Sequence, residues 1–446
     1  MVASDPHSGI EPEKIYRRVT YRLIPFLIIC YTFSVIDRLN IAMAKLQMLP
    51  DLGFSDAVYG LGAGLFFIGY LVFDVPSNIL LHRFGARWWI GRIMVSWGVV
   101  SAAMGFVTSP TWFYLMRFLL GVAEAGFFAG LVLYITYWYP ASRRGRIFAA
   151  IVLAAPLAGL IGNPLGGWIL ANLDQAWGIA AWRWLFIIEG CPSILLGFLC
   201  FVLLANGPDD AAWLSPKERA LLKQNLASDA TTSRTSGVLT FLKLPVVWVM
   251  CLICFSISAG MYTVGFWLPT MIVQTGIAGP KEIGLYAAIP SLVSIIPLLM
   301  TGVSSDRSGE RRWHVALPLF LCAFGLAIST AGNDIGLVLA AMTLAASGAI
   351  VALAQFWNFP AAILSGYAAA AGIALVNSVG NLAGFFSPTI IGAVKTTTGS
   401  TNIGVLVMAA IIAIGGALCL TIKRSLVDSP AERSALRIEQ TARKVD

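Results

Sequence analysis

Long apolar runs alternate with short polar segments along the 446 residues of this chain. About 20 apolar residues are enough to cross the hydrocarbon core of a bilayer, and the runs reach that length. The pattern predicts an all-α membrane protein with twelve transmembrane helices, six on each side of one polar stretch. The expected spans are residues 23–45, 58–81, 88–108, 111–138, 147–171, 183–205, 245–275, 283–304, 313–332, 335–361, 367–394 and 402–422.

The polar segments divide the chain into two bundles and three connecting parts. The central polar stretch contains Ser215 followed by Pro216, which predicts the start of a short amphipathic helix with serine as the N-cap. The expected segments are an N-terminal tail (1–22), a six-helix bundle (23–205), a linker with the short helix (206–243), a second bundle (244–423) and a C-terminal tail (424–446).

Basic residues predict the orientation of the chain in the membrane. They precede the first span and fill alternate loops, at 82–87, 143–146 and 307–312, whereas the other loops carry isolated charges such as Lys45 and Lys395. Because cytoplasmic loops are enriched in lysine and arginine, both tails and the linker are expected in the cytoplasm.

Composition excludes most other classes of protein. Charged residues make up 12% of the chain against about 25% in soluble domains, and the mean hydropathy is +0.80. The net charge of +8 comes from the basic loops, so no nucleic-acid partner is expected. The three histidines lie far apart, and we find no nucleotide-binding loop or nucleophile–base pair. We therefore expect no enzyme activity, no metal and no cofactor. The protein is expected to be a monomer.

The two bundles carry an internal repeat. The segment from Asn78 to Arg87 after the second span matches the segment from Gly302 to Arg311 after the eighth. His82 and Asp306 are 224 positions apart, and so are Pro164 and Pro388. Two six-span halves in the same orientation predict transport by rocking of the halves around a site near the membrane midplane.

The second copy of this repeat resembles the signature loop of the major facilitator superfamily, with glycine, aspartate and arginines at the motif positions. The first copy departs from it, with Asn78 for the glycine and His82 for the aspartate. The resemblance implies the twelve-helix major facilitator fold and a gating role for the loop. The expected gating residues are Gly302, Asp306, Arg307, Arg311, Arg83 and Arg87.

Four of the charged residues inside the predicted spans of the first bundle form two pairs of opposite charge. Each costs about 2.5–3.5 kcal/mol at the centre of a membrane helix on insertion scales. Asp37 and Arg38 are adjacent in the first span, and Arg117 and Glu124 are two helical turns apart in the fourth, hence on one face. Burial favours the neutral form of a carboxyl group and a nearby arginine opposes it, so such a group can bind and release protons. The alternative is two permanent structural ion pairs.

Asp37-Arg38-x-Asn40 and Arg117…Glu124 resemble the anion:cation symporter family within the superfamily. The resemblance implies proton-coupled import of an organic anion across a bacterial inner membrane. It implies that Asp37 and Glu124 carry protons while Arg38 and Arg117 hold the substrate. Further substrate-binding residues are expected at Tyr70, Tyr262, Phe266, Trp357 and Asn377. For Asp74, Arg92 and Glu189, roles in helix docking or gating are expected.

The substrate is expected to be an aromatic mono- or dicarboxylate, such as phthalate or a hydroxyphenylacetate. Ala155 and Ala354 stand where sugar-acid relatives offer polar groups, and aromatic residues are frequent near the expected cavity. A tartrate or sugar-acid symporter remains an alternative. So do a drug–proton antiporter, which the paired arginines oppose for cationic drugs, and a nutrient sensor that does not transport. The sequence leaves the particular carboxylate and the proton stoichiometry open.

Overall fold

Twelve apolar helices or helix pairs form the molecule. The computed structural model describes residues 12–230, 244–363 and 367–427. Eleven segments in this part are long and apolar enough to cross a membrane, and Trp313–Ile328 is a shorter apolar helix at the position of the ninth predicted span. The predicted twelve-helix membrane fold is confirmed. Residues 1–11, 231–243 and 428–446 of the predicted tails and linker, and the side chain of Asp306, lie outside the described parts.

Several predicted spans consist of two consecutive helices. The first half contains α1 (Pro12–Leu39), α2 (Ile41–Leu52), α3 (Asp56–Phe84), α4 (Ala86–Ala103), α5 (Pro110–Glu124), α6 (Phe127–Thr136), α7 (Ala141–Val152), α8 (Ala154–Asn172) and α9 (Ala181–Leu203). The second half contains α12 (Pro245–Gln274), α13 (Pro280–Ser308), α14 (Trp313–Ile328), α15 (Ile335–Phe356), α16 (Asn358–Ile363), α17 (Tyr367–Asn381), α18 (Ala383–Thr398), α19 (Asn402–Thr421) and α20 (Arg424–Val427). The sequence did not predict these breaks within spans.

A helix begins in the linker directly after Ser215, the residue predicted to be its N-cap. α10 (Pro216–Ala230) begins after Ser215, whose Oγ accepts from the N–H of Glu218 at 3.3 Å. The Glu218 carboxylate accepts in return from the N–H of Ser215 at 2.8 Å, which completes a reciprocal cap. Arg18 of α1 donates to the same carboxylate at 2.9 Å, so α10 packs against the start of α1.

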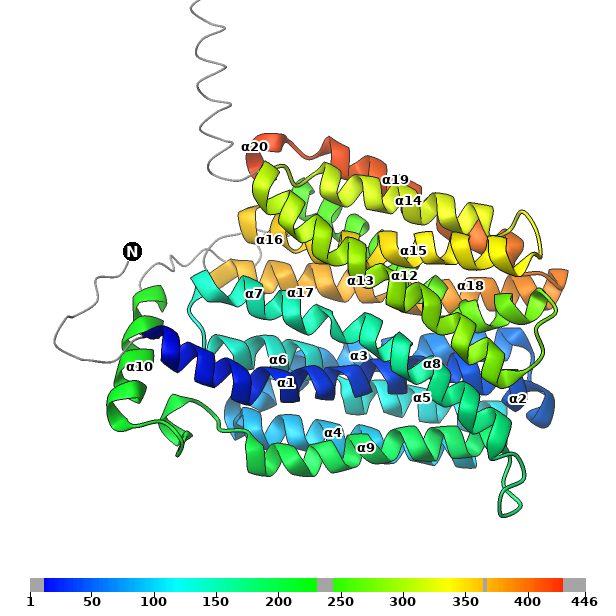
Figure 1. Cartoon of the computed structure of the whole chain (residues 1–446), viewed down its shortest axis with the longest axis horizontal. Helices are drawn as coiled ribbons and strands as arrows, with labels where there is room; N and C mark the ends of the chain where they lie inside the picture. Colours follow the sequence, from blue (N-terminus) through cyan, green and yellow to red (C-terminus); the bar gives the residue numbers. More distant parts are fainter. Residues whose placement is uncertain (1–11, 231–243, 364–366, 428–446) are drawn as a thin grey trace, which may run out of the picture.

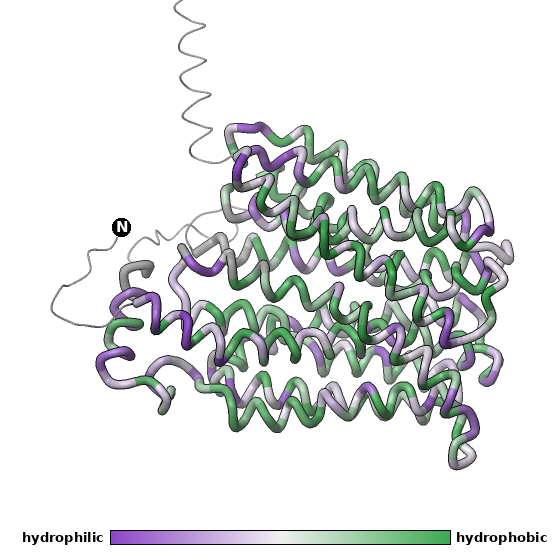
Figure 2. The backbone as a smooth tube through the Cα atoms, in the orientation of Figure 1, coloured by the Kyte–Doolittle hydropathy of each residue, from purple (hydrophilic) through white to green (hydrophobic). Residues whose placement is uncertain are grey.

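The helices run side by side along one axis, as Figure 1 shows. We call the end where α1 begins and α19 ends the terminal end, and the opposite end, with the loop at 53–55, the loop end. Hydrophobic residues cover the helices along their length, and hydrophilic residues concentrate at both ends (Figure 2). This distribution is that of a bundle spanning a membrane, where only the ends reach water.

The two halves pack together mainly through α3 against α18 and α8 against α13. Glycines permit these crossings, since a Cβ at Gly60 would lie 2.2 Å from the carbonyl oxygen of Pro388, and one at Gly284 would lie 2.4 Å from that of Asn163. Gly60 and Gly284 are 224 positions apart, the offset of the internal repeat. The duplicated halves therefore use equivalent positions to contact each other, and both crossings lie toward the loop end.

Candidate functional site

An ion pair joins Arg38 of α1 to Glu124 of α5. Nη2 of Arg38 donates to Oε1 of Glu124, and Oγ of Ser34 donates to the same oxygen at 2.7 Å. The side chain of Glu124 is 1% exposed and that of Arg38 is 13% exposed. Removing one partner from such a pair leaves a buried charge without compensation. The charge on Glu124 therefore determines whether the Arg38 guanidinium has a charged partner, and the reverse holds for Glu124.

A break in the fourth span places Glu124 at a helix end. α5 stops there because Ala125 is extended and Gly126 has φ of 83°, a conformation that glycine adopts without steric cost. The N–H of Gly126 donates to the Asp74 carboxylate of α3 at 3.0 Å. Asp74 thus docks α3 against the break.

Asp37 faces away from this pair, although it is the neighbour of Arg38 in the chain. Its carboxylate accepts from Nε1 of Trp97 at 2.8 Å, from Oγ of Ser101 at 2.9 Å and from Oγ of Ser193 at 2.5 Å. Consecutive helical residues point about 100° apart, so Asp37 points toward α4 and α9 while Arg38 points toward α3 and α5. The two predicted proton carriers therefore occupy separate environments.

Arg117 does not pair with Glu124 in the structure. Its side chain is fully buried between α5 and α3, with its guanidinium nitrogens 3.4 Å from the carbonyl oxygens of Gly62 and Ala63. The guanidinium carbon lies 5.2 Å from the centre of the Phe66 ring, and that of Arg38 lies 5.3 Å from the same ring. Phe66 therefore contacts both cations through favourable cation–π geometry.

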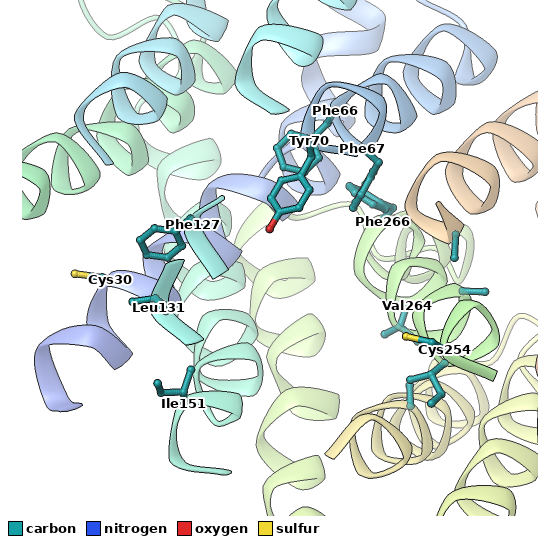
Figure 3. Packing of buried hydrophobic residues seen from close by; sticks show 14 of the residues in the cluster. Cys30, Phe66, Phe67, Tyr70, Phe127, Leu131, Ile151, Cys254, Val264 and Phe266 are labelled. Atoms are coloured by element: carbon teal, nitrogen blue, oxygen red, sulfur yellow. The ribbon is translucent and has the colours of Figure 1, made fainter. Parts of the chain in front are cut away.

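Aromatic residues from both halves surround Arg38. The hydroxyl groups of Tyr70 and Tyr262 lie close enough to interact electrostatically with its guanidinium. The Tyr262 hydroxyl donates to Oδ1 of Asn381 at 3.0 Å, which links α12 to α17. Tyr70 lies with Phe66 and Phe67 on α3, opposite Phe266 of α12 (Figure 3). Tyr70, Tyr262 and Arg38, which were each predicted to bind substrate, therefore lie together in the structure.

The other predicted substrate-binding residues of the second half make contacts of their own. Phe266 is fully buried, and its carbonyl oxygen accepts from the Tyr59 hydroxyl at 3.0 Å. Trp357 lies between α15 and α16 with its ring packed on Phe356. Asn377 is half-buried on α17, one turn before Asn381. Sequence reasoning did not single out Asn381, although its spacing from Asn377 places both on one helical face.

Two of the predicted gating arginines donate to backbone carbonyl groups of their own halves. Nε of Arg87 donates to the carbonyl oxygen of Phe201 at 2.5 Å, and Nη1 of Arg311 donates to that of Val427 at 3.4 Å. Arg83 and Arg307 are exposed, and a Cβ at Gly302 would have no neighbour within 4 Å. Their gating role stays a prediction.

A charged cluster at the loop end joins the halves, where the sequence suggested isolated loop charges. Asp56 at the start of α3 pairs with Lys45 of α2 at 3.5 Å and with Lys395 of α18 at 3.1 Å. Nζ of Lys45 lies 3.8 Å from the centre of the Trp267 ring. The predicted order of spans places Lys45 and Lys395 at the same end of the molecule. Their ion pairs with Asp56 could not be predicted, because they depend on how the helices pack.

A cavity of about 130 Å³ lies between the halves, among α1, α8, α9, α12, α13 and α15. None of the predicted substrate-binding residues lines it, whereas Ala155 does. Its polar lining consists of Asn40, Asn163, Glu189, Ser291 and Ser294. It is separate from the Arg38–Glu124 pair, because Asn40 and Arg38 lie on different faces of the first span.

Two repeated halves, buried charges within the spans and a cavity between the halves define a secondary membrane transporter rather than an enzyme. The chain belongs to the Major Facilitator Superfamily, whose family model matches residues 27–388. The multi-pass membrane assignment follows from this membership and from the apolar helices.

Curated relatives cover nearly the whole chain. It is 44% identical over 432 residues to a provisionally assigned metabolite transport protein, NicT, of Pseudomonas putida, covering 96% of this chain and 99% of that one. It is 41% identical over 424 residues to a provisionally assigned tartrate transporter of Agrobacterium vitis, covering 95% and 94%. It is also 41% identical over 404 residues to a quinolone resistance transporter of Acinetobacter baumannii, covering 90% and 93%.

A solved structure has the same fold. The chain superposes on a D-xylose–proton symporter with a TM-score of 0.72 at 13% identity, covering 92% of this chain and 99% of that one. At this identity the likeness shows the fold alone. Together with the family model, it confirms the predicted major facilitator architecture.

Proposed function

We propose that this chain is a proton-coupled symporter that imports a small organic anion across a bacterial inner membrane, with both termini in the cytoplasm. The observation that carries the proposal is the buried Arg38–Glu124 pair. It offers a cation that matches a substrate carboxylate and a carboxylate that can bind a proton. The relatives named as metabolite and tartrate transporters support the anion.

The pair supplies a mechanism of coupling. While Glu124 is ionised, it occupies the Arg38 guanidinium. Protonation of Glu124 removes that charge, and the planar fork of Arg38 then accepts the substrate carboxylate. Proton and anion therefore bind in the same state of the protein, and each favours the binding of the other.

Rocking of the halves moves the loaded site across the membrane. The glycine crossings at Gly60 and Gly284, together with the Asp56 cluster, hold the loop end closed in this structure. With the termini in the cytoplasm, the loop end is the outer face. Import requires α3 to separate from α18 and α8 from α13, which opens the outer face to substrate.

The substrate we propose is an aromatic mono- or dicarboxylate. Arg38 lies 5.3 Å from the Phe66 ring and 5.6 Å from the Tyr70 ring, so a substrate ring beside its carboxylate meets aromatic partners. Each unpaired hydroxyl costs about 1–3 kcal/mol on leaving water, which disfavours a sugar acid beside these aromatic rings. Tartrate is the alternative, favoured by the 41% identical relative, with Tyr262 and Asn377 as partners for its hydroxyl groups.

Uptake into proteoliposomes with an imposed pH gradient tests the proposal. The uptake of phthalate, 4-hydroxyphenylacetate, tartrate and galactonate is compared. Transport of a quinolone is measured in parallel to test for drug efflux. We expect accumulation of an aromatic carboxylate that stops when a protonophore is added. Accumulation of tartrate alone would overturn the aromatic preference. Uptake that ignores the protonophore would overturn proton coupling, and transport of the quinolone alone would overturn the anion symporter.

A further inference from the structure

Glu189 is a buried carboxylate that the coupling mechanism above does not use. It lies in the middle of α9, is 1% exposed and lines the cavity between the halves. Its Oε2 has no hydrogen-bond partner among the described residues. Among the described residues no cation pairs with it, whereas Glu124 pairs with Arg38. If Glu189 only docked helices against each other, its Oε2 atom would be expected to accept a hydrogen bond from a neighbouring helix.

Asn40 faces Glu189 across the contact of α1 with α9. Both amide atoms of Asn40 lack a partner within the described chain, although its side chain is only 6% exposed. The amide lies beside the Glu189 carboxylate and also lines the cavity. Two neighbouring polar groups with unused hydrogen-bonding capacity therefore point into one space. Buried polar groups are nearly always hydrogen-bonded, so this space suits water.

The size and lining of the cavity agree with water. A cavity volume of about 130 Å³ exceeds the space of about 10–15 Å³ that one water molecule needs. Asn163, Ser291 and Ser294 add polar groups to Asn40 and Glu189 around the same space. An apolar cavity of this size stays dry, but one with several polar partners binds ordered water.

Glu189 also lies next to the environment of Asp37. Ser193, which donates to Asp37, is one helical turn after Glu189 on α9, and Asn40 is one turn after Asp37 on the first span. The two carboxylates are close enough for their negative charges to repel each other. Asn40 and Glu189 line the cavity, and Asp37 lies near them where α1 packs against α9.

The charged residues that face α9 from the elements packed against it have contacts of their own. α1 contributes Asp37. α2 contributes Lys45, which pairs with Asp56, and Asp51, which accepts from Nε1 of Trp182 at 2.8 Å. α4 contributes Arg87, whose Nε donates to the carbonyl oxygen of Phe201 at 2.5 Å, and Arg92, whose guanidinium lies 4.1 Å from the Trp89 ring centre. α8 and the short helix at 104–106 carry no charged residue. On α9 itself, Nη1 of Arg183 donates to the carbonyl oxygen of Gly105 at 2.7 Å.

We propose that Glu189 is a third proton-binding carboxyl group, which receives protons from water in the cavity between the halves and exchanges them with the Asp37 environment. This inference rests on the proposed proton-coupled transport and adds an entry route that bypasses the Arg38–Glu124 pair. The transferred species is a proton carried by water, so no other reactant is needed.

Infrared difference spectroscopy of the purified protein in lipid membranes tests proton binding without any substrate. The probes are pH and D₂O. We expect the wild type to show a protonated carboxyl band that titrates with pH and shifts in D₂O, and Glu189→Gln to lose that component. Glu282→Gln, at an exposed position at the start of α13, is the matched control and keeps it. An unchanged band in Glu189→Gln, or a Glu189 band that never titrates, overturns the proposal.

Transport separates this inference from the proposed function. At a pH gradient of about one unit and zero membrane potential, each coupled proton contributes about a tenfold accumulation ratio. Labelled phthalate and tartrate are the probes. We expect Glu189→Gln to lower the ratio about tenfold while substrate exchange in the absence of a gradient is retained, and Glu189→Asp to restore accumulation in part. If the pH gradient does not change the accumulation ratio of the wild type, the proposed function is wrong. If the wild type responds and Glu189→Gln accumulates equally, only the role of Glu189 fails.

Discussion

Arg38 and Glu124 lie 86 positions apart in the chain, yet Nη2 of Arg38 donates directly to the Glu124 carboxylate. Ser34 donates to the same oxygen, so this carboxylate has one charged and one neutral donor. Charge-assisted hydrogen bonds are roughly twice as strong as neutral ones. The charge on Glu124 therefore determines how tightly Arg38 is held.

Glu124→Gln should abolish gradient-driven accumulation and keep substrate exchange. The amide mimics the protonated carboxyl group, so Arg38 stays available to the substrate, but no proton can be carried. Counterflow and pH-driven uptake in proteoliposomes measure the two activities separately. Glu124→Ala should also destabilise the fold by about 3–5 kcal/mol, because it leaves the Arg38 charge unpaired. Accumulation at the wild-type level by the glutamine variant would show that Glu124 only stabilises the fold.

The contact of α10 with α1 should weaken in acid. The N–H of Ser215 and the Arg18 guanidinium both donate to Glu218, and they hold the pKa of Glu218 below its ordinary value. A carboxyl group with a lowered pKa stabilises the folded state above its ordinary pKa of about 4.3, and this contribution is lost as the pH falls through the lowered value. We expect hydrogen-exchange protection of α10 to fall over that range. Glu218→Gln should have low protection at every pH, and an unchanged pH profile in that variant would contradict the role of the carboxylate.

The twelve spans and their two groups were predictable because each apolar run is long enough to cross a bilayer. The breaks within spans were not. Gly126 permits its break through a left-handed conformation, and it was visible in the sequence only as a small residue after Glu124. Leu153 and Leu382 separate pairs of helices although leucine favours helix, so tertiary packing determines those breaks.

The charged residues of the site were predictable, but their pairing was not. A spacing of seven placed Arg117 and Glu124 on one helical face, which is a statement about one helix. The partner of Glu124 is Arg38, on another helix, and hydropathy carries no information about which helices meet. The separation of Asp37 from Arg38 follows from helical geometry, because neighbours point about 100° apart. That signal was present in the sequence.

Asp37 should depend on its three donors. Ser193→Ala removes the hydrogen bond of 2.5 Å and leaves those from Trp97 and Ser101. Because hydrogen bonds to charged groups contribute about 1.5–3 kcal/mol, thermal unfolding should show a loss of that size. Asp37→Asn should abolish accumulation, since an amide cannot release a proton and presents its NH₂ group to a donor. Full accumulation by Asp37→Asn would assign Asp37 a structural role.

The glycine crossings should determine which end of the transporter is closed. A Cβ at Gly60 would lie 2.2 Å from the Pro388 carbonyl oxygen and 3.2 Å from Cα of Gly392, so α3 and α18 cannot keep this contact in Gly60→Ala. Backbone atoms cannot move aside as a flexible side chain can. We expect the alanine variant to favour the conformation that is open at the loop end, and Gly284→Ala at the equivalent crossing to do the same.

Spin labels across the loop end measure this shift. The labels are attached at Thr111 at the start of α5 and at Ile403 at the start of α19. Both positions are exposed, and they belong to different halves. Cys191 is exposed, unlike the six other cysteines, and is replaced by serine to keep the labelling specific. Gly145→Ala is the matched control, because a Cβ there has no neighbour within 4 Å. We expect longer label distances in Gly60→Ala than in the control, with slower return of the empty carrier and reduced uptake. Equal distance distributions in the two variants would show that the crossing does not hold the loop end closed.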